Sequence, residues 1–165
     1  MAKIHDLKSK SNNFVLAFPQ ADLDAPVYME LPAGVNPINV SDGNRRRYVL
    51  KLNKSLYGLK QAGYNWFEKL RGGLITRDFI QSEVNKCVFF RKDCIVLTYV
   101  DDCIILGKDM AIVDAVISSL KEGHEDIELV AQGSIDKYLG LLVRDIDVNI
   151  FKMSQSFLSL DEKIR

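Results

Sequence analysis

The sequence lacks the marks of several protein classes. Its three cysteines are an odd number and form no CxxC pair, which argues against a disulfide framework or a zinc site and favours buried thiols in a reducing compartment. No apolar run approaches the roughly 20 residues of a membrane span, and the N-terminus shows no signal-peptide pattern. Charge of one sign is not in excess either, because 22 basic residues balance 22 acidic ones. This balance neither supports nor excludes a basic face for nucleic acid.

The chain does have the material of a globular domain. Its 165 residues are enough for one core, and a composition with 47% apolar and 27% charged residues is globular rather than disordered. Residues 33–47 collect Gly, Pro, Asn and Ser and predict a loop. The loop ends in the basic run Arg45–Arg47, which fits either a solvated loop or a contact with a nucleic-acid backbone.

Short apolar or alternating runs predict β-strands. They cover residues 13–18, 27–31, 48–52, 88–90, 95–100 and 103–106, with a closing strand pair at 138–143 and 150–153. A turn at residues 91–93 separates the fourth run from the fifth.

Two segments have the periodicity of helices with one apolar face. The first covers residues 56–74, with Ser55 as its candidate start and Gly72-Gly73 weakening its end; the second follows Asp109 as N-cap and stops at Gly123. The order of elements predicts an α+β fold of the β-α-β-β-α-β type, an antiparallel sheet with the helices on one face. We expect six helix residues to face the sheet: Trp66, Phe67, Leu70, Ile112, Val116 and Leu120.

An acidic pair, Asp101-Asp102, interrupts the apolar stretch 95–106 (IVLTYVDDCIIL). One interpretation is a hairpin whose tip happens to be acidic, since Asp is a good turn former. Against it, the usual two-residue tip contains glycine, and this one does not. The other interpretation is a metal site, because adjacent carboxylates provide the hard oxygen ligands that Mg²⁺ prefers. A two-metal phosphoryl-transfer site would need a further carboxylate from a neighbouring strand.

Four blocks of the sequence together cover residues 13 to about 155. They are Phe14 to Gly34 (FVLAFPQADLDAPVYMELPAG), Leu52 to Trp66 (LNKSLYGLKQAGYNW), Tyr99 to Asp102 (YVDD) and Tyr138 to Val143 (YLGLLV). In this order and at these spacings, the blocks resemble the reverse transcriptase of copia-type long-terminal-repeat retrotransposons.

The resemblance implies a polymerase palm with part of the fingers over residues 1–155, and a tail at 156–165 without assignment. It implies RNA-directed DNA synthesis with two Mg²⁺ ions, an RNA template, a DNA primer and a dNTP, and an intracellular location. Asp101 and Asp102 match the family's metal-binding pair. Phe18 matches the aromatic residue that lies under the sugar of the incoming nucleotide and leaves no room for a 2′-hydroxyl. Gln61 and Tyr99 fall in the family's nucleotide-contacting blocks.

One departure from the family concerns the metal site. Where the family has its first catalytic Asp, directly before Phe14, this chain has Asn13. An amide keeps an oxygen ligand but loses the charge, so we expect impaired catalysis. The alternative function is a non-catalytic relic, or a nucleic-acid-binding domain that keeps only the fold. If the resemblance holds, Asn13 must lie on the strand next to the Asp101-Asp102 hairpin.

Overall fold

The structure is a computed structural model that describes residues 7–35, 48–122, 127–133, 137–138, 141–147 and 150–155. The basic run Arg45–Arg47 and the expected helix stop Gly123 lie outside these residues. The chain forms two compact units: Met1–Val15 with Leu70–Arg165, and Leu16–Lys69.

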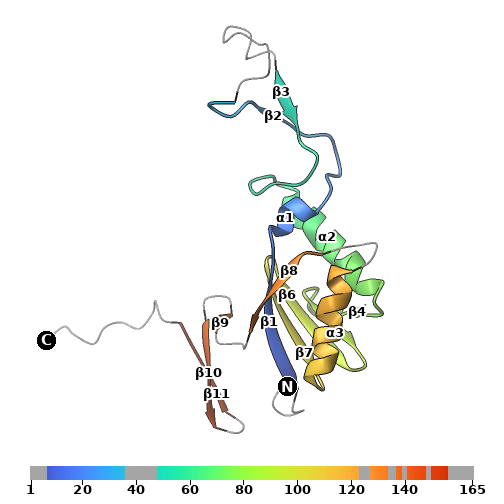
Figure 1. Ribbon diagram of the computed structural model, residues 1–165, viewed down its shortest axis with the longest axis vertical. Coiled ribbons are helices and arrows are strands. Elements are labelled where there is room, and N and C mark those ends of the chain that lie inside the picture. The colour runs from blue at the N-terminus through green and yellow to red at the C-terminus, as the bar shows by residue number, and fades with distance from the viewer. Residues whose placement is uncertain are drawn as a thin grey trace, which may run out of the picture. The chain divides into compact units, whose positions relative to one another are not determined.

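The larger unit contains a six-stranded sheet in the order β4-β5-β6-β7-β1-β8, in which every pairing is antiparallel (Figure 1). Its strands are β1 (Lys8–Phe14), β4 (Ile80–Gln81), β5 (Val88–Arg91), β6 (Cys94–Tyr99), β7 (Asp102–Gly107) and β8 (Leu129–Gly133). The first strand in the sequence therefore lies inside the sheet, between β7 and β8.

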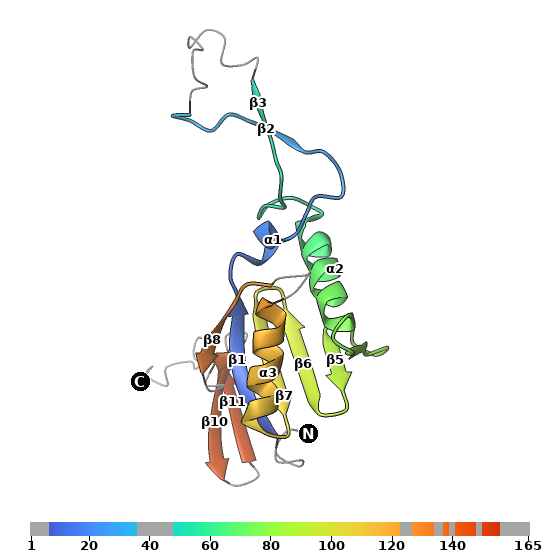
Figure 2. The same cartoon turned by 45° about the vertical axis from the view of Figure 1, so that its right-hand side comes forward.

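Helix α3 (Met110–Lys121) packs along β1, β7 and β8 (Figure 2). It begins where the Asp109 carboxylate accepts a hydrogen bond of 2.8 Å from the Ile112 N–H, as expected for the N-cap. Its apolar face is buried and comprises Val113, Val116, Ile117 and Leu120. A Cβ placed on Gly107 would lie 2.9 Å from Cγ2 of Val113. The face of β7 that carries Gly107 is therefore the one that meets α3.

Three more strands form a separate sheet in the order β11-β10-β9. They are β9 (Lys137–Tyr138), β10 (Leu141–Asp147) and β11 (Ile150–Gln155). The expected closing strand pair is confirmed in part. Strands β10 and β11 pair antiparallel, but Tyr138, expected in the first strand of the pair, ends β9, and residues 139–140 lie outside the described residues.

The smaller unit contains a single-turn helix, α1 (Ala17–Gln20), and a hairpin of β2 (Tyr28–Glu30) and β3 (Val49–Lys51). Helix α2 (Ala62–Ile75) starts in this unit and ends in the larger one. All six residues of the β2–β3 hairpin strands are exposed.

The α+β class and the antiparallel sheet are confirmed, but three details of the prediction are wrong. The strand expected over 13–18 ends at Phe14, because Leu16 adopts a left-handed conformation with φ 47° and a helical turn follows. The first helix begins at Ala62 rather than after Ser55 and continues through the Gly72-Gly73 pair to Ile75. The strand that follows α3 in the main sheet is β8, which the apolar runs did not indicate.

Four of the six helix residues expected in the core are buried. Trp66, Leu70, Val116 and Leu120 are at most 2% exposed. Phe67 and Ile112 are only half-buried, so they lie at the margin of the apolar helix faces.

Candidate active site at the β6–β7 hairpin

The acidic pair lies at the β6–β7 hairpin, shifted by one residue from the predicted turn. Tyr99 pairs with Asp102, so the two-residue loop is Val100–Asp101, and Asp102 is the first residue of β7. Val100 takes a positive φ of 52°, a conformation that is costly for a β-branched side chain. Both carboxylates are half-buried. The loop conformation thus separates them: Asp101 sits in the turn and Asp102 in the sheet.

Strand β1 brings Asn13 to this hairpin from 89 residues away in the sequence. Asn13 is the antiparallel partner of Asp102, and its Nδ2 donates a hydrogen bond of 3.3 Å to Oδ1 of Asp102. The Phe14 N–H donates to the Asp101 carbonyl at 2.7 Å. The strand expected to carry the first catalytic position therefore does lie beside the acidic pair.

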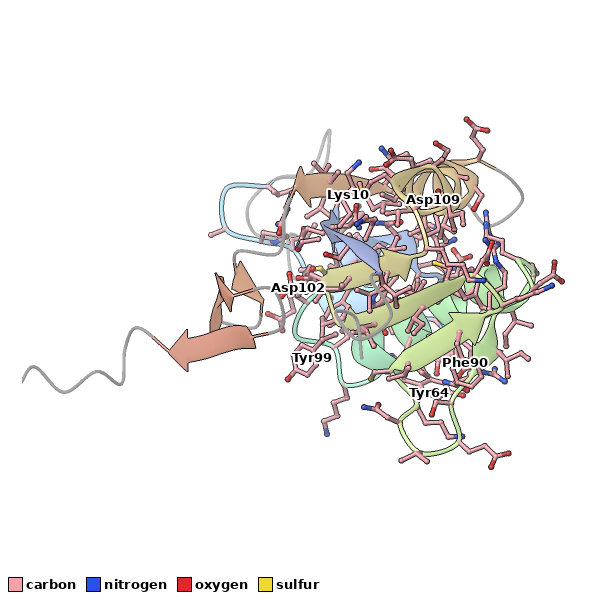
Figure 3. The ribbon with its side chains drawn as sticks, turned by 90° about the horizontal axis from the view of Figure 1, so that it is seen from below. Lys10, Tyr64, Phe90, Tyr99, Asp102 and Asp109 are labelled. Atoms are coloured by element: carbon pink, nitrogen blue, oxygen red, sulfur yellow. The ribbon has the colours of Figure 1, made fainter. Side chains whose placement is uncertain are left out.

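Tyr99, Asp102 and Asn13 form a row across β6, β7 and β1, because each is the cross-strand partner of the next. Directly opposite partners point to the same face of a sheet. The row lies on the face away from α3, since the alternation along β7 puts Asp102 and Gly107 on opposite faces. Tyr99 is 57% exposed, and Figure 3 shows Tyr99 and Asp102 on the same side of the ribbon.

The donor atoms at this hairpin suit a hard cation only in part. Asp101 and Asp102 provide two carboxylates, the ligands that Mg²⁺ prefers. The third position turns an amide N–H toward Oδ1 of Asp102, and an N–H donor cannot ligate a metal. Among the residues that the structure describes, no group of three or more His, Cys, Asp or Glu side chains is arranged so that it could hold a metal ion. The described residues therefore do not fit a three-carboxylate site for two ions.

Phe18 and Gln61 belong to the smaller unit. Phe18 lies in α1, half-buried, and its ring stacks on Tyr57 with centroids 4.4 Å apart. Gln61 directly precedes α2, and its backbone carbonyl accepts a hydrogen bond of 2.9 Å from the Asn65 N–H. The structure thus brings Asn13, Tyr99, Asp101 and Asp102 together in one unit.

Two notable residues were not indicated by the sequence analysis. Asn12 is completely buried, and its Oδ1 has no hydrogen-bond partner in the described part of the chain. Its signal in the sequence is only a polar residue inside a strand. Tyr57 stacks on Phe18. Its sequence signal was its place as an aromatic residue directly before Gly58 in the SLYGLKQ block.

Within the described ranges, no helix is long and apolar enough to cross a membrane.

The chain is similar to a known protein family and to several known proteins. The family described as reverse transcriptase (RNA-dependent DNA polymerase) matches residues 2–160. The chain is 31% identical over 143 residues, 84% of its length, to the retrovirus-related Pol polyprotein from transposon TNT 1-94 of Nicotiana tabacum. It is 39% identical over 120 residues, 67% of its length, to the polyprotein from transposon RE1 of Arabidopsis thaliana. The yeast Ty1-NL2 Gag-Pol polyprotein is 27% identical over 70% of the chain.

These relatives are much longer, and the chain covers 10%, 8% and 7% of their respective lengths. No solved structure matches the chain. The family match covers nearly every residue, including the hairpin with Asp101 and Asp102 and the strand with Asn13. The chain belongs to the reverse transcriptase family, as a segment related to the Pol polyproteins of copia-type retrotransposons.

Proposed function

We propose that this chain is the palm, with part of the fingers, of an RNA-directed DNA polymerase. In this proposal Asp101 and Asp102 bind Mg²⁺, and Tyr99, Phe18 and Gln61 contact the incoming dNTP. The other partners are an RNA template and a DNA primer whose 3′-hydroxyl attacks the nucleotide.

One observation carries this proposal. Asn13 is the direct cross-strand partner of Asp102 and lies within hydrogen-bond distance of it. A nucleotidyl-transfer site requires its acidic positions to converge although they are far apart in the sequence. Tyr99, Asp102 and Asn13 are cross-strand partners on the face of the sheet away from α3. This convergence supports the assignment of the three residues to one site.

Each residue has a different role in the proposed reaction. Bound divalent cations would supply Lewis-acid stabilisation of the transferring phosphoryl group, worth several kcal/mol. Asp101 in the turn and Asp102 at the start of β7 carry negative charge close to where the phosphates must lie. Phe18 presents a ring that leaves no room for a 2′-hydroxyl and so selects deoxynucleotides. Asn13 adds no charge, and its N–H occupies one carboxylate oxygen of Asp102. We therefore propose that nucleotide incorporation by this chain is impaired.

A graft tests the proposal. Residues 13–155 replace the matching segment of a complete copia-type enzyme, once with Asn13 and once with Asn13→Asp, and Mg²⁺-dependent dNTP incorporation is measured on an RNA template. Asn13→Asp should raise incorporation by at least tenfold, and Asp101→Asn should abolish it again. Equal incorporation by both grafts would show that position 13 is not the missing ligand.

Asn13 also favours a second candidate, a domain that keeps the fold without catalysis. It has two forms: a nucleic-acid-binding domain, and a relic that no longer binds nucleic acid. It predicts that neither graft incorporates dNTP. Primer–template binding by the grafts, measured by fluorescence anisotropy, separates the two forms of this candidate. Retained binding supports a nucleic-acid-binding domain, and loss of binding supports a relic.

A further inference from the structure

We propose that Tyr57 is a positioning residue for the Phe18 ring, and that it thereby sets how strongly the polymerase discriminates deoxynucleotides from ribonucleotides. This inference rests on the function proposed above, in which Phe18 meets the sugar of the incoming nucleotide. It concerns a second aromatic ring, that of Tyr57, and a group of hydrogen-bonded residues beside it. All of them lie within the smaller unit.

The two rings are in direct contact. Their centroids are 4.4 Å apart and their planes are tilted by 34°, an arrangement in which aromatic pairs attract each other beyond the area they bury. Tyr57 is itself 51% exposed, so one part of its ring remains open to solvent while it supports Phe18. Phe18 is half-buried on a single-turn helix, and we infer that the contact with Tyr57 helps to fix the rotation of its ring.

The far end of the Phe18 ring lies near the first turn of α2. A Cβ placed on Gly63 would lie 4.0 Å from Cζ of Phe18, an ordinary van der Waals distance. Glycine has no such carbon, so Gly63 leaves a methyl-sized gap beside the ring tip. The contact with Tyr57 is therefore the ring contact from which we argue the position of Phe18.

A clasp of four residues, Asp22, Lys54, Ser55 and Asn65, holds the Tyr57 segment against α1. The Ser55 N–H donates to the carbonyl of Ala21, the residue that ends α1, at 2.9 Å. The Ser55 hydroxyl donates to the Asp22 carbonyl at 3.3 Å, and Lys54 Nζ forms an ion pair of 2.5 Å with Asp22. The hydrogen bond to Lys54 holds the pKa of Asp22 below its usual value. The chain segments that carry Phe18 and Tyr57 are therefore joined just outside the ring pair.

Asn65 extends the clasp to helix α2. Its Nδ2 donates to Ser55 Oγ and to Asp24 Oδ1, both at 3.3 Å. Ser55 is fully buried, which explains why its hydroxyl is satisfied on both sides. Ser55 therefore joins three parts of the chain: its own segment, the segment that follows α1, and the start of α2.

Tyr57 lies in a turn over residues 56–59 that requires a glycine. The Leu59 N–H donates to the Leu56 carbonyl at 3.2 Å across residues 56–59. Gly58 in that turn has φ 100°, a conformation that other residues rarely adopt. The direction of the Tyr57 side chain is therefore set by a fixed turn two residues after the buried Ser55.

These contacts predict a specific defect when the Tyr57 ring is lost. Without it, Phe18 gains alternative rotamers, and some of them leave room for a 2′-hydroxyl. Discrimination, the ratio of kcat/KM for a dNTP to that for the matching rNTP, should fall by on the order of tenfold, the factor that corresponds to an aromatic contact of about 1.4 kcal/mol. The fall should come from faster rNTP incorporation, while dNTP incorporation changes little.

The experiment uses the graft into a complete copia-type enzyme with Asn13→Asp. The variants are Phe18→Ala, Tyr57→Leu and Tyr57→Phe, with Tyr28→Leu as a matched loss of an exposed ring on β2, where Tyr28 is 58% exposed. We expect Tyr57→Leu to lower discrimination, and Tyr57→Phe and Tyr28→Leu to retain it. A second measurement needs no activity: fluorine NMR of the chain labelled with para-fluorophenylalanine. The Phe18 resonance, assigned with Phe18→Leu, should shift in Tyr57→Leu and stay in place in Tyr57→Phe.

The outcomes separate this inference from the proposed function. If Phe18→Ala lowers discrimination and Tyr57→Leu does not, the role of Tyr57 is overturned and that of Phe18 stands. If Phe18→Ala leaves discrimination unchanged, the assignment of Phe18 fails and the inference fails with it. If the graft is inactive, the proposed function fails. The fluorine spectrum then still decides, and an unshifted Phe18 resonance in Tyr57→Leu would overturn the positioning contact.

Discussion

Asn13 lies directly opposite Asp102, so a carboxylate at position 13 would face a second carboxylate across the β1–β7 pair. Like charges in this position destabilise a sheet by roughly 0.2–1 kcal/mol. Asn13→Asp should therefore lower the free energy of unfolding by that amount in the absence of divalent cations, and millimolar Mg²⁺ should restore it, because a cation that binds only the folded state stabilises it. Urea denaturation with and without Mg²⁺ measures both effects.

The control for this prediction exchanges the two groups. The double variant Asn13→Asp with Asp102→Asn again has one acid and one amide in the pair, so without cations it should be close to the parent in stability. A loss in the double variant equal to the sum of the two single losses would mean that the two side chains do not interact.

Arg77 joins the C-terminal ends of α2 and α3. Its guanidinium donates to the carbonyls of Gly73 at 2.7 Å, Ser119 at 2.8 Å and Glu122 at 3.0 Å. Carbonyls in the last turn of a helix have no partner within the helix, and a cation there also complements the helix dipole. Arg77→Ala should cost about 2–3 kcal/mol of stability, seen as a lower Tm. Arg77→Lys should recover only part, since an ammonium lacks the planar fork. Lys121→Ala, which removes an exposed cation from the same end of α3, should change the Tm much less.

Two glycines give opposite predictions for the same substitution. Gly72 lies inside α2 with nothing within 4 Å of an added Cβ, so Gly72→Ala should stabilise the chain by roughly 0.5–1 kcal/mol through helix propensity. At Gly107 the added Cβ would lie 2.9 Å from Val113 Cγ2 and 3.2 Å from the Asp109 carbonyl oxygen. Gly107→Ala should therefore destabilise by about 1–3 kcal/mol, because α3 must move away from β7. Equal unfolding midpoints for the two variants would contradict this packing.

Burial raises the pKa of the Cys94 thiol from 9.0 to about 11, and burial likewise raises the pKa of Cys103. The unfolded chain therefore loses these protons at a lower pH than the folded chain, so their contribution to stability is intact below pH 9 and falls as the pH rises toward 11. The stability difference between the parent and Cys94→Ala should shrink over this window by up to about 1.4 kcal/mol per pH unit. Denaturation at a series of alkaline pH values measures it. A constant difference would mean that Cys94 titrates alike in both states.

The sequence predicted those parts of the fold whose signals are local. The stripe of α3, its Asp109 cap and the apolar strands around the acidic pair all follow from periodicity and capping. The adjacency of Asn13 and Asp102 was expected only from the family resemblance, because no local pattern specifies a partner 89 residues away.

The parts that were missed depend on tertiary context. Strand β8 is short, and its sequence LVAQG mixes small and polar residues, so only pairing with β1 makes it a strand. The turn was placed one residue late, at Asp101-Asp102, because nothing local predicts a valine with positive φ at Val100. The contact of Tyr57 with Phe18 joins two segments that are separated by a hairpin.

The position of β1 inside the sheet has a consequence for the order of folding. Lys8–Phe14 pairs on one side with β7 and on the other with β8, which ends at Gly133. During synthesis, β1 leaves the ribosome long before either partner exists. Its backbone N–H and C=O groups cannot form the first of these pairings until about ninety further residues have been synthesised. Pairings this distant in sequence are slow to form and leave strand edges exposed in the meantime. A permuted gene that encodes β1 after β8 would reduce the number of residues between β1 and its partner strands. Such a chain should fold faster and form the same sheet.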